Sequence, residues 1–344
     1  MRSYTEILEE AWQEHLKPKP EDAPIVISLF AGCGGSSLGY SMAGFRELLA
    51  IEWDKNAVET FRLNFPNVPV YYGDIARLSI EECLQQTGLQ PGQLDVLDGS
   101  PPCQGFSTAG KRVLNDNRNQ LFREYVRLLR GLQPRVLVME NVSGLVKGKM
   151  KLVFAEIMRE LKASGYRVSC RLLNTMYFNV PQSRQRLIWI GIREDLGIEP
   201  SHPRAESRPV TVREAWENVS VGFYPEIKGK WAEIGKRLPQ GKTDEYFAGK
   251  GHGFGLQRLA ENRPSPTIRK TMAQSGWACL LHPTLPRVIS EGEAKRLSAF
   301  PDSFMFVGKS TEYFLRMGNS VPPLFMRAIA RHIRDMGLEP RLAE

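Results

Sequence analysis

Short apolar runs alternate with amphipathic segments between residues 25 and 139. The apolar runs cover residues 25–30, 48–51, 70–72, 94–97 and 136–139, and each is short enough for a buried strand. Segments 57–64, 80–86 and 121–132 lie between them and repeat apolar residues at helical spacing. This rhythm predicts an α/β fold with a doubly wound, mostly parallel sheet and helices on both of its faces.

The pattern changes after residue 193. Before that point, residues 166–173 and 187–192 predict two further strands, which we expect to pair antiparallel at one edge of the sheet. Residues 194–284 are rich in Gly, Pro, Lys and Arg and show no alternation of strands and helices, whereas helical spacing returns at 291–299 and 323–336. We therefore expect one domain of residues 1–193 plus 285–344, and a smaller domain of residues 194–284.

The charge balance indicates a polyanionic partner. Lys and Arg number 46 against 38 Asp and Glu, and the resulting net charge of +8 suits DNA, RNA or an anionic lipid surface. The five cysteines are scattered, and neither they nor the five histidines have metal-ligand spacing, so we expect no disulfide framework and no metal site. Residues 1–20 resemble no signal peptide, and no apolar run could span a membrane, which predicts a cytoplasmic protein without a membrane partner.

A glycine-rich turn follows the first predicted strand. Gly32 and Gly34 lie just after Phe30, where glycine lets the backbone turn sharply and approach a ligand at the carboxyl edge of the sheet. The fingerprint of dinucleotide-binding folds requires a third glycine where Ser37 stands. The turn therefore predicts a nucleotide-like cofactor that lacks a pyrophosphate.

The next two strands end in groups that suit an adenosine. Glu52 follows the first glycine by about 20 residues, the distance at which an acid commonly binds ribose hydroxyls. Trp53 is placed to cover an adenine ring, and Asp74 can accept a hydrogen bond from its amino group. An adenosine without pyrophosphate that ends in a charged sulfonium is S-adenosylmethionine, which we expect as the cofactor.

A second group of reactive residues follows the later strands. Cys103 lies in a turn framed by prolines, where a partly exposed thiol can become a nucleophilic thiolate. Glu140 ends a very apolar strand and is expensive to bury without a role, which favours a proton donor over a structural cap. Arg184 and Arg186 have the same parity and would share one face of a strand, where their forks could hold a carbonyl oxygen and a phosphate. Residues 108–119 are basic and predict a lid over nucleic acid.

These residues, in this order, closely resemble the cytosine-C5 DNA methyltransferases of bacterial or archaeal restriction-modification systems. The resemblance extends from about residue 25 to about residue 331. Each sequence block alone has modest specificity, but the blocks together and in this order are highly specific. The blocks are Phe30 to Gly35 with Glu52-Trp53 and Asp74-Ile75, Gly99 to Ser107, Glu140-Asn141-Val142, Gln182 to Arg186, Arg263 to Ile268, Phe300-Pro301-Asp302 and Gly318 to Pro323.

The resemblance implies a Rossmann-like S-adenosylmethionine-dependent methyltransferase fold with a smaller target-recognition domain. It also implies a reaction in which Cys103 adds to C6 of a flipped-out cytosine in double-stranded DNA, so that C5 can accept the methyl group. Glu140 would contact N3 and the exocyclic amine, Arg186 would hold the O2 carbonyl, and Arg184 would support the site. The group that removes the C5 proton is not identifiable, and water is a plausible base.

The same resemblance implies further binding residues. The cofactor pocket would be lined by Phe30, Gly32, Gly34, Glu52, Trp53, Asp74, Ile75, Pro102, Leu121, Asn319 and Ser320. The lid would contact DNA through Ser107, Lys111 and Arg118. We expect a monomer, with a cognate restriction endonuclease that acts on the same site without forming a stable complex.

Three other functions stay open. A tRNA cytosine-C5 methyltransferase would use the same scaffold, although the Cys-Phe-Thr signature of that branch is missing. A catalytically silent DNA-binding relative is disfavoured because Cys103, Glu140 and both arginines are present. A dinucleotide-dependent oxidoreductase is disfavoured by Ser37.

Overall fold

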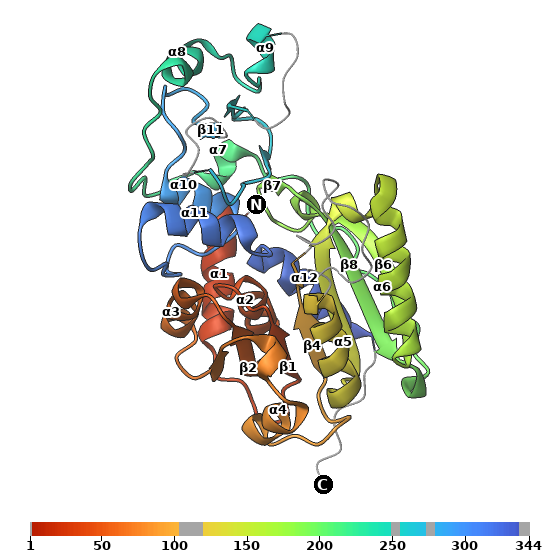
Figure 1. Ribbon diagram of the computed structural model, residues 1–344. Helices are drawn as coiled ribbons and strands as arrows, with labels where there is room; N and C mark the ends of the chain where they lie inside the picture. Colours follow the sequence, from red (N-terminus) through yellow and green to blue (C-terminus); the bar gives the residue numbers. More distant parts are fainter. Residues whose placement is uncertain (1, 103–119, 249–254, 273–278, 337–344) are drawn as a thin grey trace.

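A twisted sheet of seven strands forms the centre of the computed structural model (Figure 1). The model describes residues 2–102, 120–248, 255–272 and 279–336. The strands of the sheet follow the order β3-β2-β1-β4-β5-β8-β6. The bounds are β1 Ile25–Leu29, β2 Arg46–Glu52, β3 Val70–Tyr72, β4 Val96–Gly99, β5 Val136–Val142, β6 Tyr166–Asn174 and β8 Gln185–Arg193. The predicted doubly wound α/β fold is confirmed.

The first five strands of that order run parallel, and β8 runs antiparallel to both β5 and β6. The antiparallel pair predicted for the sheet edge is therefore confirmed. Strand β4 begins two residues later than predicted. Asp95 lies directly before this strand. Its carboxylate accepts from the backbone N–H of Ile25 at 2.8 Å and pairs with Arg135 at 3.1 Å.

Helices cover both faces of the sheet. One face packs against α1 Tyr4–Leu16, α2 Gly35–Met42, α3 Lys55–Asn64 and α12 Pro323–Asp335, and the other against α4 Ile80–Thr87, α5 Gln120–Leu132 and α6 Lys151–Ala163. Strand residues alternate between the two clusters, so that Val26 belongs to the first and Ile27 to the second. Burial on both faces explains why the parallel strands are almost wholly apolar in sequence.

Two further helices follow the sheet, α10 Glu291–Leu297 and α11 Ser310–Asn319. Helix α10 is two residues shorter than predicted, because Ala299 takes a positive φ of 59° and leaves the helical region. The sequence pattern did not predict α2, α6 or α11. No helix within the described ranges is both long and apolar enough to cross a membrane.

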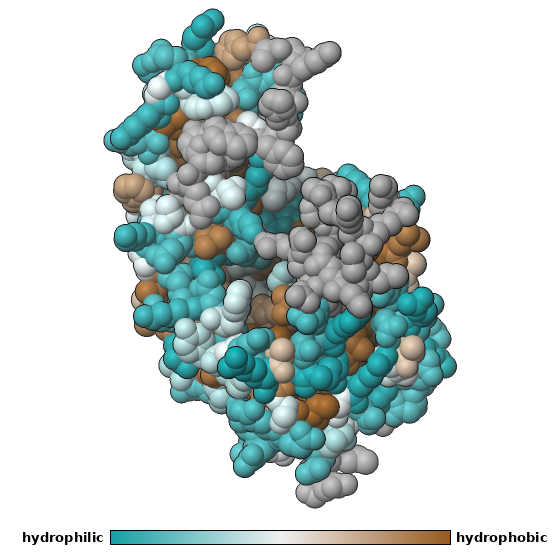
Figure 2. All heavy atoms as spheres, viewed as in Figure 1, coloured by the Kyte–Doolittle hydropathy of each residue, from teal (hydrophilic) through white to brown (hydrophobic). Residues whose placement is uncertain are grey.

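Short elements make up the upper part of the molecule in Figure 1. They are α7 Val212–Ala215, α8 Lys230–Arg237, α9 Glu245–Ala248, β9 Gln257–Arg258 and β11 Leu280–Leu281. Arg258 organises this part by donating to the carbonyl groups of Gly235, Leu238, His282, Pro283 and Leu285. Figure 2 shows this part as a narrow arm above the broader sheet-containing body. The buried cluster that contains α12 continues into the arm through Leu256 and Leu281, so the two parts share one core.

Candidate active site

The predicted site residues gather where the parallel strands end. The strand order reverses between β1 and β4, and at such a point the carboxyl edge of an open α/β sheet commonly binds ligands. Phe30 to Gly34 follow β1, Glu52 and Trp53 end β2, and Glu140 lies near the end of β5. The sequence patterns thus predicted groups that lie on one edge of the same sheet.

Backbone geometry explains the glycines after β1. Phe30 and Gly32 both have a φ of 58°, and Gly34 has a φ of 93° where it caps α2. A Cβ on Gly34 would collide with the ring of Phe65, whereas a Cβ on Gly32 would meet no atom of the described residues within 4 Å. Gly34 is therefore required by packing, and the space beside Gly32 is open to a ligand.

The Glu52 carboxylate fixes this loop. One of its oxygens accepts from the N–H of Gly32 at 2.8 Å, and the other accepts from the N–H groups of Trp53 and Asp54 at 2.9 Å. Trp53 itself is 77% exposed. A flat aromatic side chain with so little packed against it leaves a face on which an adenine ring can stack.

The remaining predicted cofactor residues come from separate parts of the chain. Exposed Asp74 caps the short helical turn Ile75–Arg77 by accepting from Ala76, and Ile75 beside it is buried. Pro102 is exposed and Leu121 is half-buried, and exposed Asn319 precedes Ser320 at the end of α11. The Ser320 hydroxyl lies 3.1 Å from the Cys33 sulfur, which brings the C-terminal block of the chain against the glycine-rich turn.

An ion pair occupies the reacting end of the edge. Arg186 Nε lies 2.6 Å from Glu140 Oε1, and the two side chains are 12% and 11% exposed. The pair crosses between β5 and the antiparallel β8, in which Glu140 lies opposite Ile188. A carboxylate and a guanidinium held this close in a nearly dry site can present a hydrogen-bond acceptor and a positive charge to the same small ring.

Arg184 is arranged differently from the prediction. It lies in the break between β7 Gln182–Ser183 and β8, and only 3% of the residue is exposed. Its guanidinium donates to the carbonyl groups of Ile268 at 3.2 Å and Gly318 at 2.9 Å. The fork that was expected to be open to a substrate oxygen or phosphate instead contacts protein backbone.

The nucleophile and lid predicted from the sequence lie outside the described residues. These are Cys103, Ser107, Lys111 and Arg118. The residues directly before them are held in place, because the Asn141 side-chain amide donates to the Pro101 carbonyl oxygen at 3.0 Å. This contact ties the start of the cysteine-containing segment to the end of β5, one residue after Glu140.

Two residues of the site were missed by the sequence reasoning. Arg316 is buried on α11 and donates to Asp54 Oδ2 at 2.9 Å, directly after Trp53. Asn141 holds Pro101 as described above. Asn141 belongs to the block Glu140-Asn141-Val142, which the sequence analysis identified. No local sequence pattern indicates a role for Arg316, because its partner is 262 positions away in the sequence.

Two acids, buried Asp98 and half-buried Glu47, accept hydrogen bonds from side chains of α2. The Ser37 hydroxyl donates to Glu47 at 3.0 Å, and the Tyr40 hydroxyl donates to Asp98 at 3.4 Å. Burial raises the pKa of Glu47 to about 7 and that of Asp98 to about 8, the latter also because Glu47 and Glu140 are nearby. Both acids therefore titrate near neutral pH inside the core that supports the site.

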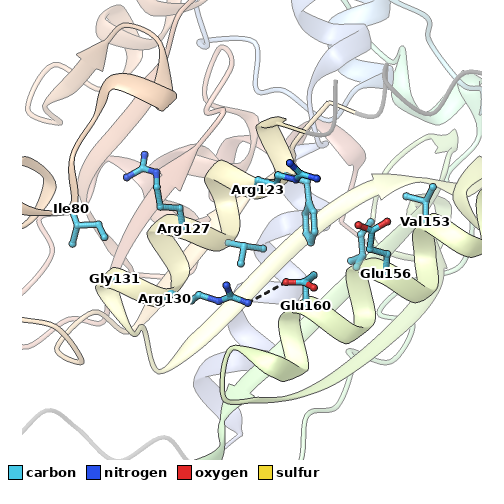
Figure 3. A pocket seen from close by; sticks show the side chains of 11 residues that line it. Ile80, Arg123, Arg127, Arg130, Gly131, Val153, Glu156 and Glu160 are labelled. Carbon is cyan, nitrogen blue, oxygen red and sulfur yellow. Dashed lines mark hydrogen bonds and ion pairs between the residues drawn. The ribbon is translucent and has the colours of Figure 1, made fainter. Parts of the chain in front are cut away.

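A hollow of about 660 Å³ lies elsewhere, on the outer face of α5 and α6 (Figure 3). Arg123, Arg127 and Arg130 line one side of it and Glu160 the other, with Arg130 and Glu160 paired at 3.1 Å. None of the predicted catalytic or cofactor residues that the structure describes lines it. This hollow is therefore distinct from the site at the carboxyl edge of the sheet.

The family profile described as C-5 cytosine-specific DNA methylase matches residues 25–335. The chain belongs to this family and is a DNA cytosine-5-methyltransferase. Members of the family are S-adenosylmethionine-dependent enzymes. The similarity covers the whole central sheet and the arm.

Named relatives agree with this assignment. The chain is 33% identical to the type II methyltransferase M.XorII of Xanthomonas oryzae pv. oryzae, over 90% of this chain and 84% of that protein. It is 34% identical to the type II methyltransferase M1.HphI of Haemophilus parahaemolyticus, over 90% and 86%.

Solved structures share the fold. A putative DNA modification methyltransferase encoded within an Escherichia coli prophage superimposes with a TM-score of 0.75 at 26% identity, covering 92% of this chain and 100% of that chain. A mutant of the DNMT2 protein of Spodoptera frugiperda has a TM-score of 0.67 at 18% identity, covering 91% and 99%, and it supports the fold alone.

Proposed function

We propose that this enzyme methylates C5 of a flipped-out cytosine within a short specific sequence of duplex DNA, through a covalent bond between Cys103 and C6. The Glu140–Arg186 pair carries the proposal, because it places an acid and a cation on the same sheet edge as a loop suited to a methyl donor. The type II relatives support a role in a restriction-modification system.

Each residue has a defined task in this reaction. The Cys103 thiolate adds to C6, and the electron pair of the C5–C6 double bond becomes available at C5. Glu140, once it has taken up a proton from solvent, supplies it to N3, and Arg186 holds the O2 carbonyl, so that charge on the ring is relieved as it develops. After methylation, a base removes the C5 proton and the thiolate leaves C6, which restores the aromatic ring. Attack on ring faces requires the base to leave the stack.

The edge of the sheet fits the methyl donor. The open space beside Gly32, the exposed ring of Trp53 and the exposed carboxylate of Asp74 suit a sulfonium-bearing adenosine. Bound there, S-adenosylmethionine supplies the methyl group that C5 takes up. Glu52 holds the loop that forms the floor of this site.

We further propose that residues 194–284 form the target-recognition domain and that residues 1–193 and 285–344 form the catalytic domain. The arm of short elements above the sheet supports this division, because it carries Lys and Arg on surface helices such as α8. The enzyme acts as a monomer, and a cognate endonuclease acts on the same sequence without a stable complex.

Trapping with a fluorinated substrate tests the covalent step. Duplex DNA of mixed sequence, amplified with 5-fluoro-dCTP, should form a denaturation-resistant adduct in the presence of S-adenosylmethionine. The adduct persists because C5 carries fluorine in place of the proton whose loss releases the enzyme. Cys103→Ser should form none. A wild-type enzyme that migrates only as free protein on a denaturing gel would contradict the mechanism, and an adduct with fluorinated tRNA alone would move the substrate to RNA.

A second prediction concerns the cofactor. Trp53→Ala should weaken binding of S-adenosylhomocysteine about tenfold, because stacking on an aromatic ring contributes roughly 1–3 kcal/mol per base. Calorimetry without DNA measures this loss directly. Phe223→Ala removes another exposed aromatic ring, 58% accessible in the arm, and should leave cofactor affinity unchanged. Equal affinities for the Trp53 variant and the parent would place the adenosine elsewhere.

A further inference from the structure

Arg184 joins segments that are far apart in the sequence. One of its hydrogen bonds reaches Ile268, just after the short strand β10 Ser265–Pro266 that pairs with β7, and the other reaches Gly318 near the end of α11. The neighbouring Gln182 side chain also accepts from the Ile268 N–H and donates to the Leu297 carbonyl oxygen. The segment that carries Arg184 is thus fastened to three separate parts of the chain.

Burial of the Arg184 guanidinium is energetically unfavourable for a residue with a purely structural role. A guanidinium has five N–H donors, and the Arg184 Nε has no hydrogen-bond partner among the residues that the structure describes. Burial, with Arg186 nearby, lowers the pKa of Arg184 to about 9, and the Glu140 charge acts in the opposite direction. A buried cation that contacts no carboxylate among the described residues is in an unfavourable position, which indicates that this position serves the site.

Helix α11 connects this cation to the cofactor side. Arg316 on the helix donates to Asp54, and Ser320 after the helix contacts Cys33 in the glycine-rich turn. Packing is also tight at the other end of the contact. A Cβ on Gly318 would collide with the backbone N of Lys270 and lie 2.6 Å from the carbonyl carbon of Arg269. The end of α11 therefore fits closely between the Ile268 segment and the cofactor loop.

We propose that Arg184 is a positioning residue for the cofactor: by holding the Gly318 carbonyl, it fixes Asn319 and Ser320 against the glycine-rich turn, although it lies beside the cytosine-binding pair. This inference rests on the proposed function, because it assumes that the turn binds the methyl donor. It also assigns different roles to Arg184 and Arg186, which lie two residues apart. Arg186 acts on the base, and Arg184 acts on the helix end that completes the other half of the site.

The two possible roles of Arg184 predict different measurements. If Arg184 only supported Arg186, its loss would lower kcat and leave cofactor binding in the absence of DNA unchanged. If it positions α11, its loss raises the Kd for S-adenosylhomocysteine without DNA and raises KM for the methyl donor more than it lowers kcat. Cofactor affinity without DNA is therefore the decisive readout.

Isothermal titration of Arg184→Met with S-adenosylhomocysteine tests the proposal. We expect an increase in Kd of about tenfold, the size expected for the loss of a charged hydrogen bond to a positioning group. Arg184→Lys can reach one carbonyl group at a time and should give an intermediate Kd. The matched control is Arg171→Met, which removes an exposed arginine from β6 and should bind like the parent.

Gly318→Ala perturbs the contact between Arg184 and α11 from the side of the helix. Its methyl group must push α11 away from residues 269–270, so it should weaken cofactor binding in the same direction as Arg184→Met. If Arg184→Met does not fold, as judged by circular dichroism, the comparison uses Arg184→Lys and Gly318→Ala. Folded variants that bind within twofold of the parent would overturn the inference. A parent enzyme that binds no S-adenosylhomocysteine would instead overturn the proposed function.

Discussion

Glu140→Gln should lower the methylation rate by a factor of about 10²–10³, within the range of a lost general acid. Glutamine keeps the volume of the side chain and an oxygen for Arg186 Nε, which lies 2.6 Å from the carboxylate. It has no acidic proton to give to N3 as the ring takes up electrons from the thiolate. The loss should therefore appear in the chemical step, whereas DNA and cofactor should bind with nearly unchanged affinity. Single-turnover transfer of a radiolabelled methyl group separates chemistry from product release.

Glu156→Gln provides the matched control. Glu156 lies on α6 and lines the hollow at α5 and α6, so this substitution should have no effect on the rate. A Glu140 variant that retains more than a tenth of the parental single-turnover rate would contradict the assignment. A variant with normal chemistry but weak DNA binding would show that the Glu140–Arg186 pair recognises the base without transferring a proton.

The sheet and the position of the site could be predicted because their signals are local. Buried parallel strands are continuous apolar runs, and the groups that follow them must meet at one edge whatever the details of the helices. Glu52, Trp53 and Glu140 were therefore found correctly at strand ends. The helix α2 escaped prediction because its sequence is rich in glycine and serine, and it is stabilised by tertiary packing against α12.

Long-range partners could not be read from the sequence. The parity of Arg184 and Arg186 suggested one shared face, but the ladder breaks at Arg184, and its carbonyl partners lie 84 and 134 residues away. Arg316 gave no local signal for its pairing with Asp54. Such contacts depend on where helices pack, which a single sequence constrains weakly.

The acids Glu47 and Asp98 are a second feature that only the structure shows. Glu47 lies on β2, Asp98 lies on β4 five residues before Cys103, and α2 covers both through Ser37 and Tyr40. Other groups that face Asp98 are Ser36 and, at longer range, Tyr125 and Glu140. Both acids lie in an otherwise apolar sheet face. The free energy of unfolding therefore depends on whether their carboxyl groups are protonated.

Asp98→Asn should make the enzyme more resistant to alkaline conditions. Burial raises the pKa of Asp98 from 3.8 to about 8 and that of Glu47 from 4.5 to about 7. The native protein therefore keeps protons that the unfolded chain releases, and the free energy of unfolding falls as pH rises between about 4 and 8. Asparagine removes one titrating group and can still accept from Tyr40, so the decline should become shallower.

Urea unfolding at pH 6.0 and pH 8.5 measures this effect. Between these values the parent should lose on the order of 2 kcal/mol more of its unfolding free energy than Asp98→Asn, because one proton per molecule corresponds to about 1.4 kcal/mol per pH unit. Asp22→Asn changes an exposed acid and should follow the parent. Parallel pH profiles for all three proteins would show that Asp98 is already ionised at pH 6. In that case the fold must stabilise a buried negative charge at Asp98, five residues before Cys103 in the sequence, and this charge would oppose formation of the Cys103 thiolate.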